Sequence, residues 1–179
     1  MYKDFEKVLV NKQDLQKRIT ELAKEMDELY KNSNPLFICI LKGSVFFTAD
    51  LLKTLTIPCE MEFMAVSSYG SDTKTSGEVK LIKDLNVPIQ DRDVVIIEDI
   101  IDSGNTLSYL KRLLEQRSPK SVKICTLLDK PERRKVDLSA DFVGFVIPDE
   151  FVVGYGLDYD EKYRNLPFVG VLKPSVYGG

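Results

Sequence analysis

The chain has 179 residues, of which 44% are hydrophobic and 30% charged, so it can form one compact globular domain with a sizeable core. Its net charge of −3 argues against bulk electrostatic binding of nucleic acid, and the absence of histidine excludes histidine-based acid–base and metal chemistry. Three single cysteines in apolar runs, without metal-type spacing, predict buried free thiols in a reducing compartment. With no signal-peptide core and no apolar run of membrane-spanning length, we expect a cytoplasmic protein without membrane contact.

The first third of the chain predicts two helices around one buried strand. Asn11 caps a helix that runs to about residue 31, and its apolar residues recur at three- and four-residue steps. Residues 36–41 are continuously apolar, as expected of a strand that is covered on both faces. After a break at Lys42-Gly43-Ser44, residues 45–55 predict the second helix.

Two more strands are predicted in the middle of the chain, over residues 60–66 and 79–85. The residues between them, 67–78, are small and polar and have little to anchor them. This stretch therefore predicts a mobile surface loop.

The most informative segment is Val94–Leu107. Four aliphatic residues predict a buried strand that ends in two adjacent carboxylates, Glu98 and Asp99. A polar loop, Asp102-Ser103-Gly104-Asn105-Thr106, follows, and residues 104–116 have a helical pattern. A strand, a glycine-containing polar turn and a helix N-terminus are the parts of a phosphate-binding loop.

The two adjacent carboxylates (the acid pair) restrict the kind of ligand that this segment can bind. Because carboxylates repel phosphates, Glu98 and Asp99 beside a phosphate site should accept hydrogen bonds from hydroxyl groups or bind a metal ion. A ligand with a phosphate at one end and vicinal hydroxyl groups in its middle is a ribose 5-phosphate. The segment therefore predicts a ribose 5-phosphate site.

Three other interpretations compete for the segment. Asp102 or Ser103 could simply cap the following helix. A strand ending in Glu-Asp could hold Mg²⁺ in a nucleoside triphosphatase, but the chain has no Gly-x-x-x-x-Gly-Lys-Ser/Thr loop. A dinucleotide-binding fold is excluded likewise, because no Gly-x-Gly-x-x-Gly follows a strand.

The last third predicts strands over residues 122–128, 142–147 and 168–172. Strands that alternate with helices indicate an α/β fold with a largely parallel twisted sheet flanked by helices. Ligands of such sheets bind beyond the carboxyl ends of the strands, which is where Glu98 and Asp99 are expected.

Residues 94–107 resemble the phosphoribosyl-diphosphate signature of the type I phosphoribosyltransferases. Further segments, in the same order and over nearly the whole chain, resemble the hypoxanthine(-guanine) branch of that family: Leu41-Lys42-Gly43, Ser68-Tyr69, Leu127-Leu128-Asp129-Lys130, the run from Phe151 to Tyr159, and Arg164. The signature alone indicates the superfamily. The run from Phe151 to Tyr159 with Arg164 makes the branch specific.

For the sugar, the resemblance implies that Glu98 and Asp99 hold the ribose hydroxyl groups and can also meet the metal. It implies that the loop residues Asp102, Ser103, Gly104, Asn105 and Thr106 bind the 5-phosphate. Asp102 would also be the catalytic residue, as general base or hydrogen-bond acceptor at the purine nitrogen opposite the attacking one.

For the diphosphate, the resemblance implies contacts from Lys42, Gly43 and Arg164, and in this family the Leu41-Lys42 peptide is often cis. Ser68 and Tyr69 would belong to a lid that excludes water from the reacting centre.

For the purine, the resemblance implies four positions. Lys130 would donate to the exocyclic oxygen of a 6-oxopurine, Phe151 would stack on the ring, and Val152 would present its backbone to the base edge. Asp158 would lie at the purine, and its carboxylate would bind the metal ion. Without the resemblance, Lys130 would be interpreted as a solvated side chain and Asp158 as a turn residue.

The implied function is purine salvage: transfer of the 5-phosphoribosyl group from phosphoribosyl diphosphate to hypoxanthine and guanine, with Mg²⁺, giving the nucleotide and diphosphate. The resemblance also implies a homodimer or homotetramer that acts on small molecules. We expect a single domain over residues 1–179, with a core of about 30–140 and a small hood over the active site from the N-terminal residues and about 142–179.

Two functional alternatives stay open. One is a transferase that prefers xanthine or guanine, and the other is a non-catalytic regulator of the same fold that senses nucleotides and binds RNA. The second would need a basic surface, and the basic run Arg133-Arg134-Lys135 predicts a solvated surface rather than a binding patch.

Overall fold

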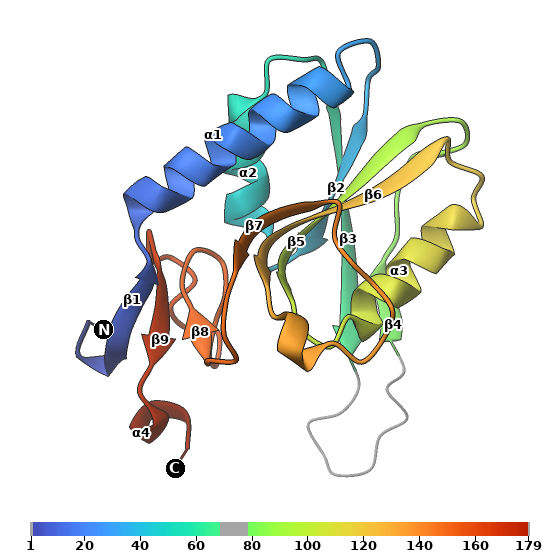
Figure 1. The fold of residues 1–179 in the computed structure, drawn as a ribbon. Helices are drawn as coiled ribbons and strands as arrows, with labels where there is room; N and C mark the ends of the chain where they lie inside the picture. Colours follow the sequence, from blue (N-terminus) through green and yellow to red (C-terminus); the bar gives the residue numbers. More distant parts are fainter. Residues whose placement is uncertain (1, 69–78, 179) are drawn as a thin grey trace.

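The computed structural model describes residues 2–68 and 79–178, which form a larger and a smaller sheet with helices packed on them (Figure 1). The strands of the larger sheet are β2 (Leu36–Leu41), β3 (Glu60–Ser68), β4 (Val79–Lys83), β5 (Asp93–Ile101), β6 (Ser121–Asp129) and β7 (Phe142–Val146). They lie in the order β4-β3-β2-β5-β6-β7, and every neighbouring pair is parallel except β3 with β4. The expected α/β fold with a largely parallel sheet is confirmed.

Helices cover both faces of this sheet. α1 (Lys12–Leu29) and α2 (Val45–Thr54) lie on one face, and α3 (Asn105–Glu115) lies on the other (Figure 1). The alternation of side chains along β2 explains its apolar sequence, because Phe37 packs under α1 and α2 while Leu36 and Ile38 pack under α3.

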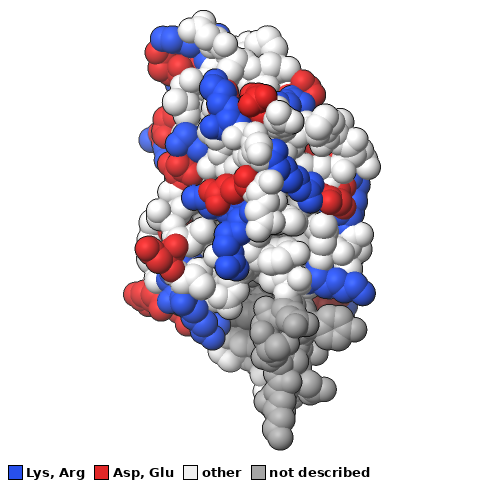
Figure 2. Space-filling model, turned by 90° about the vertical axis from the view of Figure 1, so that its right-hand side faces the viewer, with Lys and Arg blue, Asp and Glu red and all other residues white. Residues whose placement is uncertain are grey.

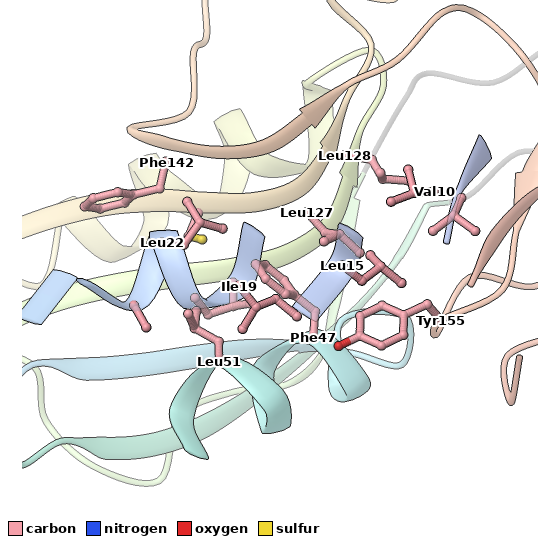
Figure 3. Packing of buried hydrophobic residues seen from close by; sticks show 14 of the residues in the cluster. Val10, Leu15, Ile19, Leu22, Phe47, Leu51, Leu127, Leu128, Phe142 and Tyr155 are labelled. Carbon is pink, nitrogen blue, oxygen red and sulfur yellow. The ribbon is translucent and has the colours of Figure 1, made fainter. Parts of the chain in front are cut away.

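The core under α1 and α2 is a single buried cluster. Ile19 and Leu22 of α1, Phe47 and Leu51 of α2, and Leu127 of β6 converge in it (Figure 3). The three- and four-residue spacing of apolar residues in α1 directs them to the same side of the helix. The Asn11 side chain accepts a hydrogen bond from the Asp14 backbone N–H at 2.9 Å, so the predicted cap begins this helix.

The smaller sheet is antiparallel, with β9 (Val169–Leu172) between β1 (Phe5–Val10) and β8 (Val152–Val153). It joins the beginning of the chain to its last third, as the expected hood does. A short helix, α4 (Pro174–Tyr177), follows β9, and two 3-10 turns cover Tyr2–Asp4 and Pro131–Arg133.

The hood was expected to begin at about residue 142. Residues Phe142–Val146 pair with β6 in the larger sheet, so the smaller sheet takes its C-terminal strands from Val152 onward. The boundary between core and hood stays a prediction, because the buried cluster under α1 also includes Val152 and Val169 of the smaller sheet.

Tyr155, which follows β8, ties the end of the smaller sheet's second strand in sequence to α2. Its side chain lies in the buried cluster beside Leu15 and Phe47 (Figure 3), and its hydroxyl donates to Asp50 Oδ2 of α2 at 2.6 Å. Burial and the hydrogen bond to the Asp50 carboxylate raise the pKa of Tyr155 well above its usual range. The hydroxyl is therefore a permanent donor in this contact.

The observed elements and cysteines can be compared with the sequence predictions. α1, α2, α3 and most strands agree with the predictions to within two residues, whereas β1, β8 and α4 were not predicted. Cys39 and Cys125 are buried free thiols as expected, and Cys59 is a half-buried one. Within the described part of the chain, no helix has the length and apolar character that crossing a membrane requires.

Candidate active site

The carboxyl ends of three adjacent parallel strands bring the predicted site segments together. The loops that follow β2, β5 and β6 contain Lys42-Gly43, Asp102–Thr106 and Lys130, respectively. Neighbouring loops touch directly, since the Lys130 N–H donates to the Ile101 carbonyl at 2.9 Å. Segments that are far apart in sequence therefore share one edge of the sheet (Figure 1).

The acid pair lies inside β5 rather than at its end. The prediction that the strand stops at Glu98-Asp99 is wrong, because β5 continues to Ile101 and pairs with β6 up to Asp129. Both carboxyl groups are half-buried, and burial raises their pKa values, with the Asp99 charge raising that of Glu98 further. Because ionising these two carboxyl groups costs free energy, the site favours ligands that stabilise carboxylates, such as hydroxyl groups or a cation.

The Lys42-Gly43 loop approaches this pair closely. A Cβ atom on Gly43 would lie 1.5 Å from Asp99 Oδ2, so a larger residue here would have to displace the Asp99 carboxylate. The Leu41-Lys42 peptide is cis, as the family resemblance implied. Lys42 itself is exposed, and its ammonium group lies 3.1 Å from Glu161.

The loop after β5 encloses a small cavity of about 100 Å³, whose lining includes four of the five residues that were predicted to bind the phosphate: Asp102, Ser103, Gly104 and Thr106. Gly104 caps α3 in the left-handed region, with a φ of 83°, and the exposed Asn105 begins the helix. A left-handed glycine before a helix N-terminus turns backbone N–H groups toward one point. The helix starts at this glycine rather than at Asp102 or Ser103.

Asp102 is held by two arginines from the run that was predicted to be a solvated surface. The Arg133 Nε atom lies 2.5 Å from Asp102 Oδ1, and Arg134 donates from one terminal nitrogen to the Asp102 carbonyl at 2.9 Å. The other terminal nitrogen of Arg134 contacts the Asp129 carboxylate. The prediction holds for Arg133, which is exposed, and is wrong for Arg134, whose side chain is only 14% exposed and contacts the loop.

The Asp102 carboxylate nevertheless lacks an aligned donor. Its Oδ1 atom is buried and accepts no hydrogen bond from any described residue, because the Arg133 contact has the distance but not the direction of one. A buried acceptor without a donor costs free energy unless a ligand supplies that donor.

The predicted purine-binding residues lie at the start of the smaller sheet, beside the end of β6. Lys130 is buried, and its ammonium group donates to the Glu150 carbonyl at 2.7 Å, next to Phe151. Phe151 is 38% exposed, and Val152 is buried as the first residue of β8. Without the family resemblance, the sequence predicts a solvated Lys130. That prediction is wrong, because the side chain is buried.

Asp158 and Arg164, which follow β8 in the chain, are the remaining predicted site residues. They pair at 2.8 Å, and a second terminal nitrogen of Arg164 donates to the Gly156 carbonyl at 2.7 Å. Glu161 lies 3.5 Å from Arg164 and 3.1 Å from Lys42, so one carboxylate contacts both of the cations that were predicted to bind diphosphate. Nothing in the sequence pattern pointed to Glu161.

The predicted lid is described only in part. Ser67 and Ser68 are the last residues of β3, so the expected mobile loop does not begin at Ser67. Tyr69 and the rest of the stretch to residue 78 lie outside the described residues.

A magnesium ion fits this site only together with substrate oxygens. Among the described residues, no group of three or more Cys, Asp or Glu side chains is arranged to hold a metal. Mg²⁺ is usually bound in proteins by one or two carboxylates, with substrate phosphates and waters completing its octahedron. Asp158 and the pair Glu98-Asp99 can supply that number of carboxylates.

Comparisons with other proteins agree with this arrangement. The family model for the phosphoribosyl transferase domain matches residues 7–160. A hypoxanthine-guanine phosphoribosyltransferase of Bacillus subtilis (strain 168) is 58% identical over 99% of this chain and 98% of its own length. The crystal structure of a hypoxanthine phosphoribosyltransferase from Staphylococcus aureus superposes with a TM-score of 0.96 at 48% identity, covering 100% of this chain and 97% of that one.

A further relative is longer. The bifunctional protein TilS/HprT of Listeria monocytogenes (strain F2365) is 57% identical over 99% of this chain, which spans 27% of that protein's length. The matched domain, the identities and the shared fold lead to the same conclusion: the chain belongs to the phosphoribosyl transferase family.

Proposed function

We propose that this chain is a purine salvage enzyme that transfers the 5-phosphoribosyl group of phosphoribosyl diphosphate to hypoxanthine and guanine, in the cytoplasm. The observation that carries the proposal is the convergence of three parts at one sheet edge: the Asp102–Thr106 loop, the acid pair in β5, and Lys130 with Phe151. A phosphate, a ribose and a 6-oxopurine occupy these parts in that order. Relatives that are 51–58% identical over nearly the whole chain carry the same name for this activity.

The sugar end is bound by the loop and the acid pair. The 5-phosphate lies in the cavity before α3, where backbone N–H groups and the Ser103 and Thr106 hydroxyl groups donate to it. The ribose hydroxyl groups donate to Glu98 and Asp99. These hydrogen bonds stabilise the ionised carboxylates and offset the cost of their burial.

The reaction replaces one bond at the first carbon of the ribose. A ring nitrogen of the purine attacks this carbon while the bond between the carbon and the diphosphate oxygen breaks. The transition state has oxocarbenium character. The opposite nitrogen of the imidazole ring carries a hydrogen that it donates to Asp102, whose buried Oδ1 atom lacks a donor. Transfer of this proton toward Asp102 raises the nucleophilicity of the attacking nitrogen.

The leaving diphosphate is held by Lys42, the Gly43 backbone and the Arg164 guanidinium group. Asp158 or the acid pair would supply one or two carboxylates to Mg²⁺, which, completed by substrate oxygens, would neutralise the charge that develops on the diphosphate. Lys42 and Arg164 exchange their contact with Glu161 for this group when the diphosphate binds.

Selection of the base follows from Lys130 and its neighbours. The buried ammonium group has three donors, and one is already used by the Glu150 carbonyl, so another can donate to the exocyclic oxygen of hypoxanthine or guanine. The amino group of adenine offers a donor in that place and leaves both groups unpaired.

The test is a panel of purines. Steady-state rates with hypoxanthine, guanine, xanthine, adenine and uracil, at saturating phosphoribosyl diphosphate and Mg²⁺, should show turnover of the first two and none of adenine. Adenine turnover comparable to that of hypoxanthine would contradict the role of Lys130. Xanthine or guanine turnover well above that of hypoxanthine would favour the alternative of a differently selective transferase.

The alternative of an RNA-binding regulator needs a basic surface. On the face in Figure 2, blue and red side chains are interspersed over the described residues. Many of the basic side chains are paired, as in Arg117–Asp84 and Lys120–Asp93. Tight, sequence-specific RNA binding at physiological salt without turnover of any purine would reverse our choice.

The family resemblance also favours a homodimer or homotetramer. Sedimentation equilibrium at several protein concentrations tests this assembly, and a monomer at all of them would contradict it.

A further inference from the structure

Phe151 belongs to a cluster of three aromatic rings on the smaller sheet. Tyr177 of α4 stacks on it, with ring centroids 4.5 Å apart and planes inclined by 22°. Tyr159 meets the Phe151 ring edge-on at 5.7 Å and 87°, and it meets Tyr177 at 6.5 Å and 69°. We call Phe151, Tyr159 and Tyr177 the aromatic cluster.

Tyr177 approaches Phe151 from the side of the hood. Together with Val176 and Tyr159 it packs against a buried hydrophobic cluster that consists of Phe5, Val153, Leu166, Phe168 and Leu172. Figure 1 shows α4 beyond β9, away from the larger sheet. One face of the Phe151 ring is therefore covered by the hood itself.

Phe151 lies next in sequence to the carbonyl that Lys130, another predicted base ligand, contacts. Lys130, at the end of β6, donates to the carbonyl of Glu150, the residue directly before Phe151. Phe151 is still 38% exposed although Tyr177 covers one ring face and Tyr159 meets an edge. The exposed part of the ring is thus the part that is free to receive a purine.

We propose that Tyr177 is a positioning residue for the purine base: it stacks behind Phe151, so that Tyr177, Phe151 and the bound purine form three successive stacked rings. This inference rests on the proposed function. An exposed phenylalanine loses side-chain freedom when a ligand stacks on it, and a ring already fixed from behind has less to lose. Offset stacking in turn stabilises each ring pair.

The competing arrangement has the opposite consequence. If Tyr177 occupied the place of the purine, the base would have to displace it, and removal of its ring would tighten purine binding. The packing of Tyr177 against the hood cluster argues against this arrangement. The direction in which the KM for hypoxanthine changes therefore separates the two.

The experiment compares Tyr177→Ala, Tyr177→Leu and Tyr177→Phe with the unchanged chain in steady-state assays with hypoxanthine and phosphoribosyl diphosphate. We expect the KM for hypoxanthine to rise about 3- to 10-fold in the Ala and Leu variants, as loss of a stacked pair implies. The Phe variant should restore it to within about twofold. The kcat and the KM for phosphoribosyl diphosphate should change little, because Tyr177 lies away from the sugar site.

Two controls separate stacking from folding. Tyr177→Leu keeps an apolar side chain of useful size if Tyr177→Ala unfolds, and thermal melting reports the stability of each variant. Val176→Ala changes the neighbouring residue of the same short helix and should leave the KM for hypoxanthine unchanged. Calorimetric titration with inosine monophosphate should show the same ranking without any turnover.

Each outcome decides the question. An unchanged KM for hypoxanthine in both Tyr177→Ala and Tyr177→Leu overturns the inference, as does a fall in KM or an equal loss of activity with both substrates. A failure of the proposed function is recognised separately, because the unchanged chain would then turn over no purine, and the inference would fall with it.

Discussion

At the scale of single residues, Asp102 has the clearest physical signature in the site. Its carboxylate is close to the Arg133 guanidinium group, yet its Oδ1 atom is buried and accepts no hydrogen bond from the described residues. The Arg133 contact holds the carboxylate in place, and a ligand N–H would supply the hydrogen bond that Oδ1 does not receive from the described residues. These two properties suit an acceptor for a purine ring hydrogen.

Asp102→Asn tests this role directly. An amide keeps the shape of the side chain but is not basic, so kcat should fall by about 10²-fold or more. Rapid-quench or steady-state assays give kcat, and thermal melting checks that the fold is intact. Rates near those of the unchanged chain would reduce Asp102 to a residue that shapes the loop.

Glu161 illustrates a different effect of one residue. Its exposed carboxylate contacts both Lys42 and Arg164, which would otherwise be free to meet the diphosphate. Glu161→Gln should therefore lower the KM for phosphoribosyl diphosphate by about two- to fivefold at low ionic strength, and less at high salt, as is typical of exposed ion pairs.

Asp160→Asn is the matched control for this prediction. It removes the same charge one residue away, but Asp160 pairs with Lys162 and not with the predicted diphosphate ligands. An equal fall in KM for both variants would mean that the net charge near the site matters and the specific contacts of Glu161 do not.

At the scale of elements, the site is an assembly of loops that meet backbone to backbone. A Cβ atom on Gly156 would lie 1.9 Å from the Gly43 carbonyl oxygen, so the turn after β8 rests directly on the loop after β2. Gly156 also has a φ of 107°, which side chains rarely adopt. The hood and the core therefore depend on this glycine for their contact.

Gly156→Ala should separate these two loops. The strained backbone alone should cost about 1 to 3 kcal/mol of the free energy of unfolding, measured by chemical denaturation. Because the turn carries Asp158 on to the site, kcat/KM for both substrates should fall together. A variant with unchanged stability and kinetics would show that the loops can move apart without consequence.

Sequence patterns predicted the elements of the larger sheet well, and physical reasons explain the exceptions. The alternation of helix and strand periods is strong where both sheet faces are covered, as along β2. β1 escaped prediction because it is half exposed and its pairing with β9 is interrupted by two register shifts, which break the two-residue period. β5 is longer than predicted because its acidic residues lie within the strand.

The sequence likewise predicted one part of the candidate site and missed another. The resemblance supplied residues whose positions along the chain are fixed by motifs, and the structure brings Lys42, Asp102 and Lys130 to one edge. Arg133, Glu161 and Tyr177 had no signal, because their contacts depend on how loops fold over one another. Charge runs and single aromatic residues do not encode such contacts.

At the scale of the whole molecule, ligands should stiffen the junction between the two sheets. The predicted sugar site belongs to the larger sheet, whereas Asp158, one of the predicted metal carboxylates, follows β8 of the smaller sheet. In the proposed complex, phosphoribosyl diphosphate with Mg²⁺ spans this junction, so its binding should increase the free energy of unfolding of the whole chain.

Thermal melting measures this stabilisation. At a ligand concentration about 100 times Kd, binding adds about 2.7 kcal/mol, which for a chain of this size raises the Tm by about 5 to 10 °C. Chelation of Mg²⁺ by EDTA should remove most of the shift. A shift that persists in EDTA would mean that the metal carboxylates contribute little to binding.

The smaller sheet joins β1, at the start of the chain, to β9, near residue 170. During synthesis on a ribosome, β1 leaves the exit tunnel before β2 to β7 and β9, so it must wait for its partner until the residues between them have also emerged. The larger sheet, from β2 to β7, can form during that interval from strands that are nearer in sequence. The predicted sugar side of the site can thus form before its predicted purine side, and β9 completes the smaller sheet.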